Sequence, residues 1–179
     1  MKSANSSNFA GLIIDMQPEF LKFISPKEKE NMIQCQVNMI HYFSDNGIPL
    51  FILEFCGQGK TIEDITKRID FSKNERPIIK TIEDGFYRTG LHQLLKKQKS
   101  KKIILMGINA YYCVKETAEG AIDKGYEIYT ARNLIAEKAR YTDREMNTKI
   151  ENWYSTSGTY FKTQKQLENF LQFGKFRNY

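Results

Sequence analysis

The sequence IILMGINAYYCVKETA, residues 103–118, has the pattern of a buried strand, a turn and the first turns of a helix. Residues 103–108 form an apolar run without polar alternation, which is typical of a strand covered on both faces of a parallel sheet. From Tyr112 onward apolar residues recur at helical spacing, and Gly125 marks the end of this helix. The stretch therefore predicts a strand–turn–helix unit of an α/β protein.

The same alternation of short apolar runs and amphipathic stretches extends along the chain in both directions. Further strands are expected at residues 9–15, 49–55, 77–80, 126–131 and 159–163, and further helices at residues 25–47, 86–99, 141–153 and 165–173. Strands that alternate with helices build parallel sheets through right-handed crossovers. We therefore predict a three-layer α/β/α fold around a mostly parallel sheet of about six strands.

The length of the chain indicates its domain organisation. Its 179 residues fall within the range of ~100–200 residues that usually forms one domain. The sequence contains no internal repeat and no linker rich in proline or glycine. Residues 1–179 are therefore expected to form a single domain, with the polar residues 1–8 loosely attached.

The chain is basic, with 27 Lys and Arg against 21 Asp and Glu, a net charge of +6. The densest basic run, KKQKSKK at residues 96–102, follows a predicted helix, and lysines at a helix C-terminus complement its dipole. Aromatic residues do not interleave with this run, as they do in platforms that stack nucleic-acid bases. We expect a solvated helix end here and no nucleic-acid partner.

The cysteines and the N-terminal residues indicate the compartment. Cys35, Cys56 and Cys113 are an odd set without the short spacing of a zinc or redox motif. The N-terminal residues lack the apolar core of a signal peptide, and no apolar run approaches the ~20 residues that span a bilayer. We expect a cytoplasmic protein with free thiols and no membrane partner.

Three chemically active residues stand at the carboxyl ends of predicted strands, where open parallel sheets bind ligands. Asp15 ends the first strand, Lys80 ends the third, and Cys113 follows the fourth. Taken singly, they have simple structural alternatives: a capping carboxylate, a solvated lysine and a small buried thiol. Together, at equivalent strand ends, they predict one nucleophilic site.

These three groups could perform acyl transfer without a histidine. A thiol with a pKa of ~8.5 is mostly protonated at neutral pH. A helix N-terminus and a nearby ammonium would lower that pKa, or Asp15 would take the proton directly as the substrate arrives. Backbone N–H groups of residues 107–113 could supply an oxyanion hole.

The motifs around these residues resemble those of the isochorismatase-like cysteine hydrolases, the superfamily of nicotinamidase and N-carbamoylsarcosine amidase. Residues 12–20, LIIDMQPEF, match the hydrophobic-DMQxxF opening of that family. Residues 78–91 contain its lysine segment with the F-x-x-T-x-L continuation, and residues 107–118 match G-x-x-x-x-x-C-V-x-x-T-A. The resemblance covers about residues 9–163.

The resemblance implies a Rossmann-like hydrolase fold and a catalytic triad. Asp15 would be the general base and Cys113 the nucleophile, while Lys80 would stabilise the thiolate and the developing negative charge. In the implied reaction Cys113 attacks a carbonyl, ammonia or an amine leaves, and the resulting thioester is hydrolysed.

The resemblance also implies the surroundings of the triad. The amides of Asn109 and Cys113 would form the oxyanion hole, with a cis peptide bond before Asn109. Phe20 and Tyr112 would lie beside the substrate.

The sequence departs from the nicotinamidases at their metal site. Where those enzymes carry Asp-x-His after the second strand, the corresponding residues 53–60 read LEFCGQGK, and the two histidines, His41 and His92, both fall in predicted helices. No zinc or iron cluster can be assembled from them at familiar spacing, so we expect no metal and no cofactor. Glu54 is then either a residue that lines the substrate pocket or a structural cap.

The predicted function is metal-independent hydrolysis of a small amide or related C–N substrate. Relatives of this kind are commonly oligomeric, so we expect a small-molecule substrate and a homo-oligomer. The alternative is a catalytically silent or binding member of the same fold that recognises an anionic metabolite or a macromolecule. A redox-sensing thiol is less favoured, because neither Cys35 nor Cys56 stands at an obvious resolving position.

Overall fold

The computed structural model describes residues 8–138 and 144–174. The expectation of a loosely attached N-terminus concerns residues 1–8, of which residues 1–7 lie outside the described ranges. Asn8 is attached, because its carbonyl oxygen accepts the N–H groups of Lys101 (2.8 Å) and Lys102 (3.0 Å). These bonds join the start of the first strand to the start of a neighbouring strand.

The described residues form a seven-stranded sheet in which every pairing is parallel. The strand order is β3-β2-β1-β4-β5-β7, and β6 pairs with β4 outside this path. The strands are β1 (Phe9–Ile14), β2 (Leu50–Phe55), β3 (Ile78–Lys80), β4 (Lys102–Ile108), β5 (Glu127–Ala131), β6 (Ile135–Ala136) and β7 (Thr159–Phe161). The six predicted strands are confirmed, and the two-residue β6 is additional.

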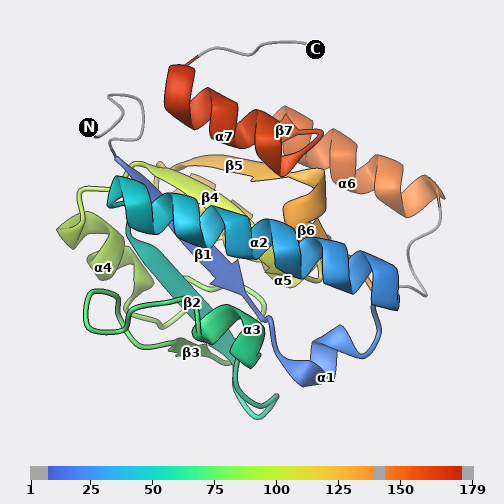
Figure 1. The fold of residues 1–179 in the computed structure, drawn as a ribbon, viewed down its shortest axis with the longest axis horizontal. Coiled ribbons are helices and arrows are strands. Elements are labelled where there is room, and N and C mark those ends of the chain that lie inside the picture. Colours follow the sequence, from blue (N-terminus) through green and yellow to red (C-terminus); the bar gives the residue numbers. More distant parts are fainter. Residues whose placement is uncertain (1–7, 139–143, 175–179) are drawn as a thin grey trace.

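Helices cover both faces of this sheet, as Figure 1 shows. The α-helices are α1 (Pro18–Leu21), α2 (Pro26–Asn46), α3 (Glu63–Thr66), α4 (Leu91–Lys97), α5 (Cys113–Asp123), α6 (Arg144–Ser157) and α7 (Gln164–Phe173), with a 3₁₀ helix at Arg132–Leu134. Ser25 caps α2 as its sequence predicts, because its hydroxyl accepts the N–H of Glu28. Gly47, at a φ of 64°, ends this helix.

Helix α4 begins later than the sequence predicts. The sequence predicts a helix from residue 86, but residues 85–88 form a turn and residues 89–90 a bend. The Asp84 carboxylate accepts the N–H of Phe86 (2.8 Å), and the Thr89 hydroxyl donates to the Gly85 carbonyl (2.6 Å). Such short-range side-chain bonds compete with helical hydrogen bonds and favour turns.

Two apolar cores lie on the two faces of the sheet. Alternate residues of β1 point to opposite faces, so that Ile13 packs with α2 and α7 while Leu12 and Ile14 pack with α5 and α6. Nearly every residue of β1 and β4 is fully buried, which explains their continuous apolar sequence. The three-layer α/β/α fold is therefore confirmed.

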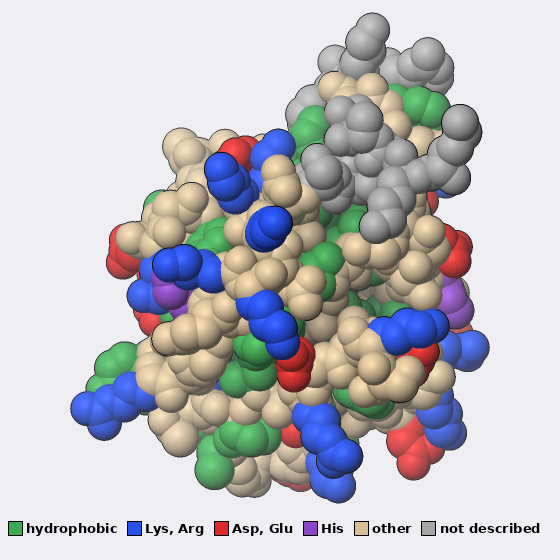
Figure 2. All heavy atoms as spheres, turned by 90° about the vertical axis from the view of Figure 1, so that its left-hand side faces the viewer, with side chains coloured by type: hydrophobic (Ala, Val, Ile, Leu, Met, Phe, Trp, Pro, Cys, Tyr) green, Lys and Arg blue, Asp and Glu red, His purple; other side chains and the backbone are tan. Residues whose placement is uncertain are grey.

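The basic run ends a helix, as expected. Lys96 and Lys97 form the last turn of α4 and are exposed. Figure 2 shows lysine and arginine side chains spread over one face of the molecule rather than gathered in one patch. No helix within the described ranges is both long and apolar enough to cross a membrane.

Candidate active site

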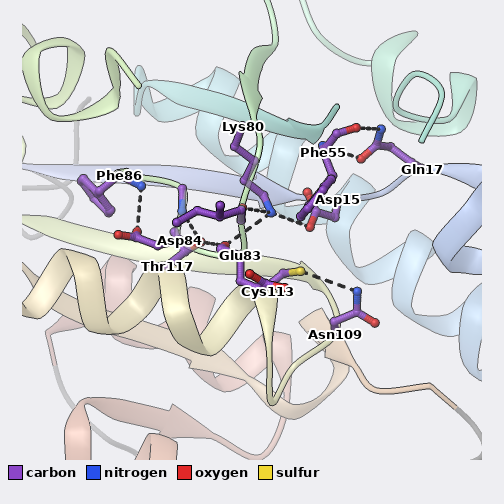
Figure 3. A network of polar contacts seen from close by, with 12 residues as sticks. Asp15, Gln17, Phe55, Lys80, Glu83, Asp84, Phe86, Asn109, Cys113 and Thr117 are labelled. Atoms are coloured by element: carbon purple, nitrogen blue, oxygen red, sulfur yellow. Dashed lines mark hydrogen bonds and ion pairs between the residues drawn. The ribbon is translucent and has the colours of Figure 1, made fainter. Parts of the chain in front are cut away.

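The carboxyl ends of β1, β3 and β4 bring together the three residues that the sequence places at strand ends (Figure 3). Asp15 directly follows β1, Lys80 is the last residue of β3, and Cys113 begins α5 after β4. In the strand order β3-β2-β1-β4, β1 and β4 are neighbours, and only β2 separates β1 from β3. All three are buried, at 0%, 1% and 4% exposure.

Asp15 and Lys80 form a buried ion pair, with 2.8 Å between Oδ2 and Nζ. The Lys80 ammonium also donates to the carbonyl oxygens of Ile82 (3.2 Å) and Glu83 (3.3 Å). The centre of the Phe55 ring lies 4.5 Å from Nζ, within the range of a cation–π contact. These partners replace the water that the buried charge has lost, so they hold the ammonium in one place.

The environment of Asp15 makes its carboxylate a stronger base than usual. Burial raises the pKa of the Asp15 carboxyl above its ordinary value of 3.8, and Lys80 opposes this only in part. The backbone of Asp15 has a φ of 56°, in the left-handed region that aspartate tolerates better than most residues. This turn ends β1 at the site.

Cys113 lies beside the ion pair as a protonated thiol. Burial, as the largest cause, and then the negative charge of Asp15 raise the pKa of Cys113 to about 12, while Lys80 opposes them. The Lys80 ammonium thus lowers this pKa, as expected, but burial and the charge of Asp15 outweigh it in the resting protein. Direct transfer of the proton to a carboxylate remains as the route to a thiolate.

The turn between β4 and α5 contains the residues expected to form an oxyanion hole. None of the described peptide bonds is cis, so the expectation of a cis bond before Asn109 is wrong. The chain turns instead through the left-handed φ of Asn109, 62°, which asparagine tolerates well. Cys113 is the first residue of α5, and N–H groups in a first turn lack an acceptor within the helix.

This turn is held in place by a residue that the sequence analysis missed, Glu137. The carboxylate of Glu137 is 1% exposed and accepts the N–H of Tyr111 (2.8 Å). Beside it, the N–H of Ala110 donates to Ala136 (3.0 Å), and the Tyr154 hydroxyl donates to the carbonyl of Ala110 (2.7 Å). No motif marks Glu137, because its contact joins residues 26 positions apart.

Two of the expected substrate-binding residues lie at the edge of the site. The ring of Phe20 is 6.1 Å from the ring of Phe55, which itself faces Lys80. Tyr112 directly precedes Cys113 and is 46% exposed. Phe20 is thus a partly buried ring beside Phe55, and Tyr112 is an exposed residue next to Cys113 in the chain, whereas no motif singled out Phe55.

The third expected substrate-binding residue, Glu54, lies away from this cluster. Neighbouring residues of a strand point to opposite faces, and Phe55 faces Lys80, so Glu54 points to the other face of the sheet. Its buried carboxylate accepts the N–H of Thr61 (2.7 Å). Of the two roles that the sequence allows for Glu54, a pocket residue or a structural cap, this bond corresponds to the cap.

The residues available for metal binding are few. In the part of the chain that the structure describes, no three His, Cys, Asp or Glu side chains are arranged to hold a metal ion. The two histidines belong to different helices: His41 to α2 and His92 to α4, where the His92 Nδ1 lies 3.0 Å from the Tyr126 hydroxyl. The groups at the strand ends, a thiol, a carboxylate and an ammonium, suit nucleophilic acyl transfer.

Comparison with a known protein relates the chain to isochorismatases. A secreted isochorismatase effector of Verticillium dahliae is 28% identical over 102 residues, which make up 57% of this chain and 50% of that protein. The matched segment thus spans half the length of that relative.

Solved structures share the fold at low sequence identity. Ribonuclease MAR1 of Caenorhabditis elegans has a TM-score of 0.79 and 19% identity, over 97% of this chain and 85% of that one. N-carbamoylsarcosine amidase of Thermoplasma acidophilum has a TM-score of 0.73 and 20% identity, over 88% and 96% of the two chains. The model of the isochorismatase domain family matches residues 9–156. Because this match covers most of the sequence, the chain belongs to the isochorismatase family, a family of hydrolases related to amidases.

Proposed function

We propose that this protein is a cysteine hydrolase that cleaves a small amide or a related C–N bond through a thioester on Cys113. The observation that carries the proposal is the contact of a buried thiol with the buried Asp15–Lys80 ion pair. Buried titratable groups with shifted pKa values are concentrated at functional sites. The shared fold of N-carbamoylsarcosine amidase supports a C–N substrate.

In the first step, Asp15 takes the proton of the Cys113 thiol while the sulfur attacks the substrate carbonyl carbon. The electrons of the C=O double bond move to the oxygen, which accepts the N–H groups of Asn109 and Cys113. The Lys80 ammonium stabilises the negative charge on the sulfur and then on the oxygen. A base with a raised pKa suits this transfer, because the thiol that it deprotonates is a weak acid.

In the second step, the C–N bond breaks and Asp15 returns its proton to the leaving nitrogen, which departs as ammonia or an amine. Water then attacks the thioester while Asp15 again accepts a proton. The C–S bond breaks, the sulfur recovers the proton, and a carboxylic acid leaves. Phe20 and Tyr112 contact the substrate at the rim of the site.

We propose that the reaction needs no metal ion, because Asp15, Lys80 and Cys113 handle each proton and charge in it. The protein would work as a homo-oligomer on a small molecule in the cytoplasm. The three free cysteines are consistent with a reducing compartment.

The test is a panel of N-carbamoyl amino acids, nicotinamide and simple primary amides. We expect release of ammonia from at least one of them and, after acid quenching, an acyl adduct on the peptide that contains Cys113. Ammonia assays and peptide mass spectrometry measure the two outcomes. Salt-sensitive binding to RNA or to an anionic metabolite, with neither ammonia nor adduct, would favour the catalytically silent alternative.

The pH dependence of kcat/KM should follow the carboxylate and not the thiol. Asp15 must be ionised to act, and burial raises its pKa above 3.8, so activity is lost on acidification at a higher pH than for an exposed aspartate. The thiol pKa of about 12 predicts no second rise near pH ~8.5, where an ordinary cysteine ionises. Circular dichroism at each pH separates this effect from unfolding. A rate that rises with ionisation near pH ~8.5 contradicts the mechanism.

A further inference from the structure

Gln17 is a fully buried glutamine whose carboxamide makes three hydrogen bonds at the end of β2. Its Oε1 accepts the N–H of Phe55 (2.7 Å), and its Nε2 donates to the carbonyls of Phe55 (3.0 Å) and Gly59 (2.5 Å). One side chain thus satisfies both backbone groups of Phe55. A buried amide with all its main partners present is held rigidly.

This bonding continues the sheet where β1 has ended. The register between β1 and β2 stops at Ile14 opposite Leu53, and the N–H of Asp15 still donates to the Leu53 carbonyl (3.0 Å). After Asp15 the chain that leaves β1 turns away from β2. The backbone N–H and C=O of Phe55 would then have no hydrogen-bond partner on the β1 side. The Gln17 carboxamide supplies the donor and the acceptor that a further residue of β1 would have offered.

Gln17 also connects the two halves of the ion pair (Figure 3). Its own N–H donates to the carbonyl of Asp15 (2.7 Å), and the Phe55 that it holds is paired in register with Lys80 and places its ring 4.5 Å from Nζ. We propose that Gln17 is a positioning residue that fixes Lys80 relative to Asp15 and Cys113. Its role in catalysis rests on the proposed function, whereas its effect on the thiol does not.

The proposal predicts a change in the chemistry of Cys113. Lys80 lowers the pKa of this thiol and also that of Asp15. If Phe55 is released and the ammonium moves away, both pKa values rise. At alkaline pH, where Asp15 is ionised, a smaller fraction of Cys113 is then thiolate, so its alkylation slows.

The test compares Gln17→Met with Gln36→Met, a matched control. Gln36 is also fully buried and donates to the carbonyl of Leu134 (2.9 Å), but it lies in α2 away from the ion pair. Iodoacetamide labelling of the Cys113 peptide is followed by mass spectrometry between about pH 8 and 10. We expect Gln17→Met to slow labelling about 3- to 10-fold, because one pKa unit changes the thiolate fraction tenfold, and Gln36→Met to leave it unchanged.

A second variant keeps the test valid if Gln17→Met does not fold. Phe55→Leu retains the backbone groups that Gln17 binds but removes the ring over Lys80, so it should slow labelling in the same direction. An unchanged labelling rate in a folded Gln17→Met protein, or in Phe55→Leu if the former does not fold, overturns the inference. Failure of the proposed function would appear separately, as absence of turnover and adduct in the wild-type protein.

Discussion

Replacing Cys113 with alanine is expected to lower turnover of any substrate found in the amide panel by at least about 10³-fold. The change removes the sulfur that attacks the carbonyl, and neither Asp15 nor Lys80 can form the thioester in its place. The side chain is small and sits in the first turn of α5, so the fold should remain. Steady-state ammonia release and the acyl adduct in quenched samples are the two measurements.

Cys35→Ala is the matched control for this variant. Cys35 is also buried, at 8% exposure, on the inner face of α2, and its sulfur lies 3.1 Å from the Asn133 Nδ2. The control should keep its turnover and its adduct, because this thiol has no contact with the ion pair. Full activity of Cys113→Ala on the same substrate would end the cysteine mechanism.

Replacing Asp15 with asparagine should have opposite effects on turnover and on thiol reactivity. Turnover falls by at least about 10²-fold, because the base is lost. The negative charge of Asp15 raises the pKa of Cys113, so its removal lowers that pKa and speeds alkylation. A protein that is less active while its nucleophile is more reactive identifies Asp15 as the proton acceptor.

The same substitution leaves the Lys80 ammonium buried without its carboxylate. Removal of one partner of a buried pair typically costs about 3–5 kcal/mol, which chemical denaturation measures. Glu28→Gln is the control, because Glu28 is a half-buried carboxylate of α2, away from the ion pair, whose pKa is also raised by burial. It should leave alkylation of Cys113 unchanged. Slower alkylation in Asp15→Asn would contradict the assigned electrostatics.

Much of the fold could be predicted from the sequence because the core strands are continuous apolar runs. β1 and β4 are buried along nearly their whole length, and a strand of this kind is visible without knowledge of its neighbours. The start of α4 could not be predicted, because it depends on the bonds of Asp84 and Thr89 to nearby backbone groups. The pattern of apolar residues contains no information on such bonds.

The three central residues of the candidate site could also be predicted from the sequence, because local features mark them. Strand ends and family motifs identify Asp15, Lys80 and Cys113, which the fold brings to one edge of the sheet. Gln17 lies within the DMQxxF motif, but its contacts, like those of Glu137, join distant segments, and no local pattern encodes such contacts. The direction of the thiol pKa shift also depends on burial, and burial is a property of the whole packed structure.

The position of Tyr112 next to Cys113 has a consequence for how such a protein could change its specificity. One peptide bond separates a side chain that is 46% exposed from one that is 4% exposed. Under the proposed function, substitutions at the outer position would alter what is recognised at little cost to folding, since exposed positions tolerate change. Such substitutions would leave the buried thiol of Cys113 and its reactivity unchanged. New substrates could therefore be acquired by successive neutral changes at the rim, while the chemistry inherited with the interior stays the same.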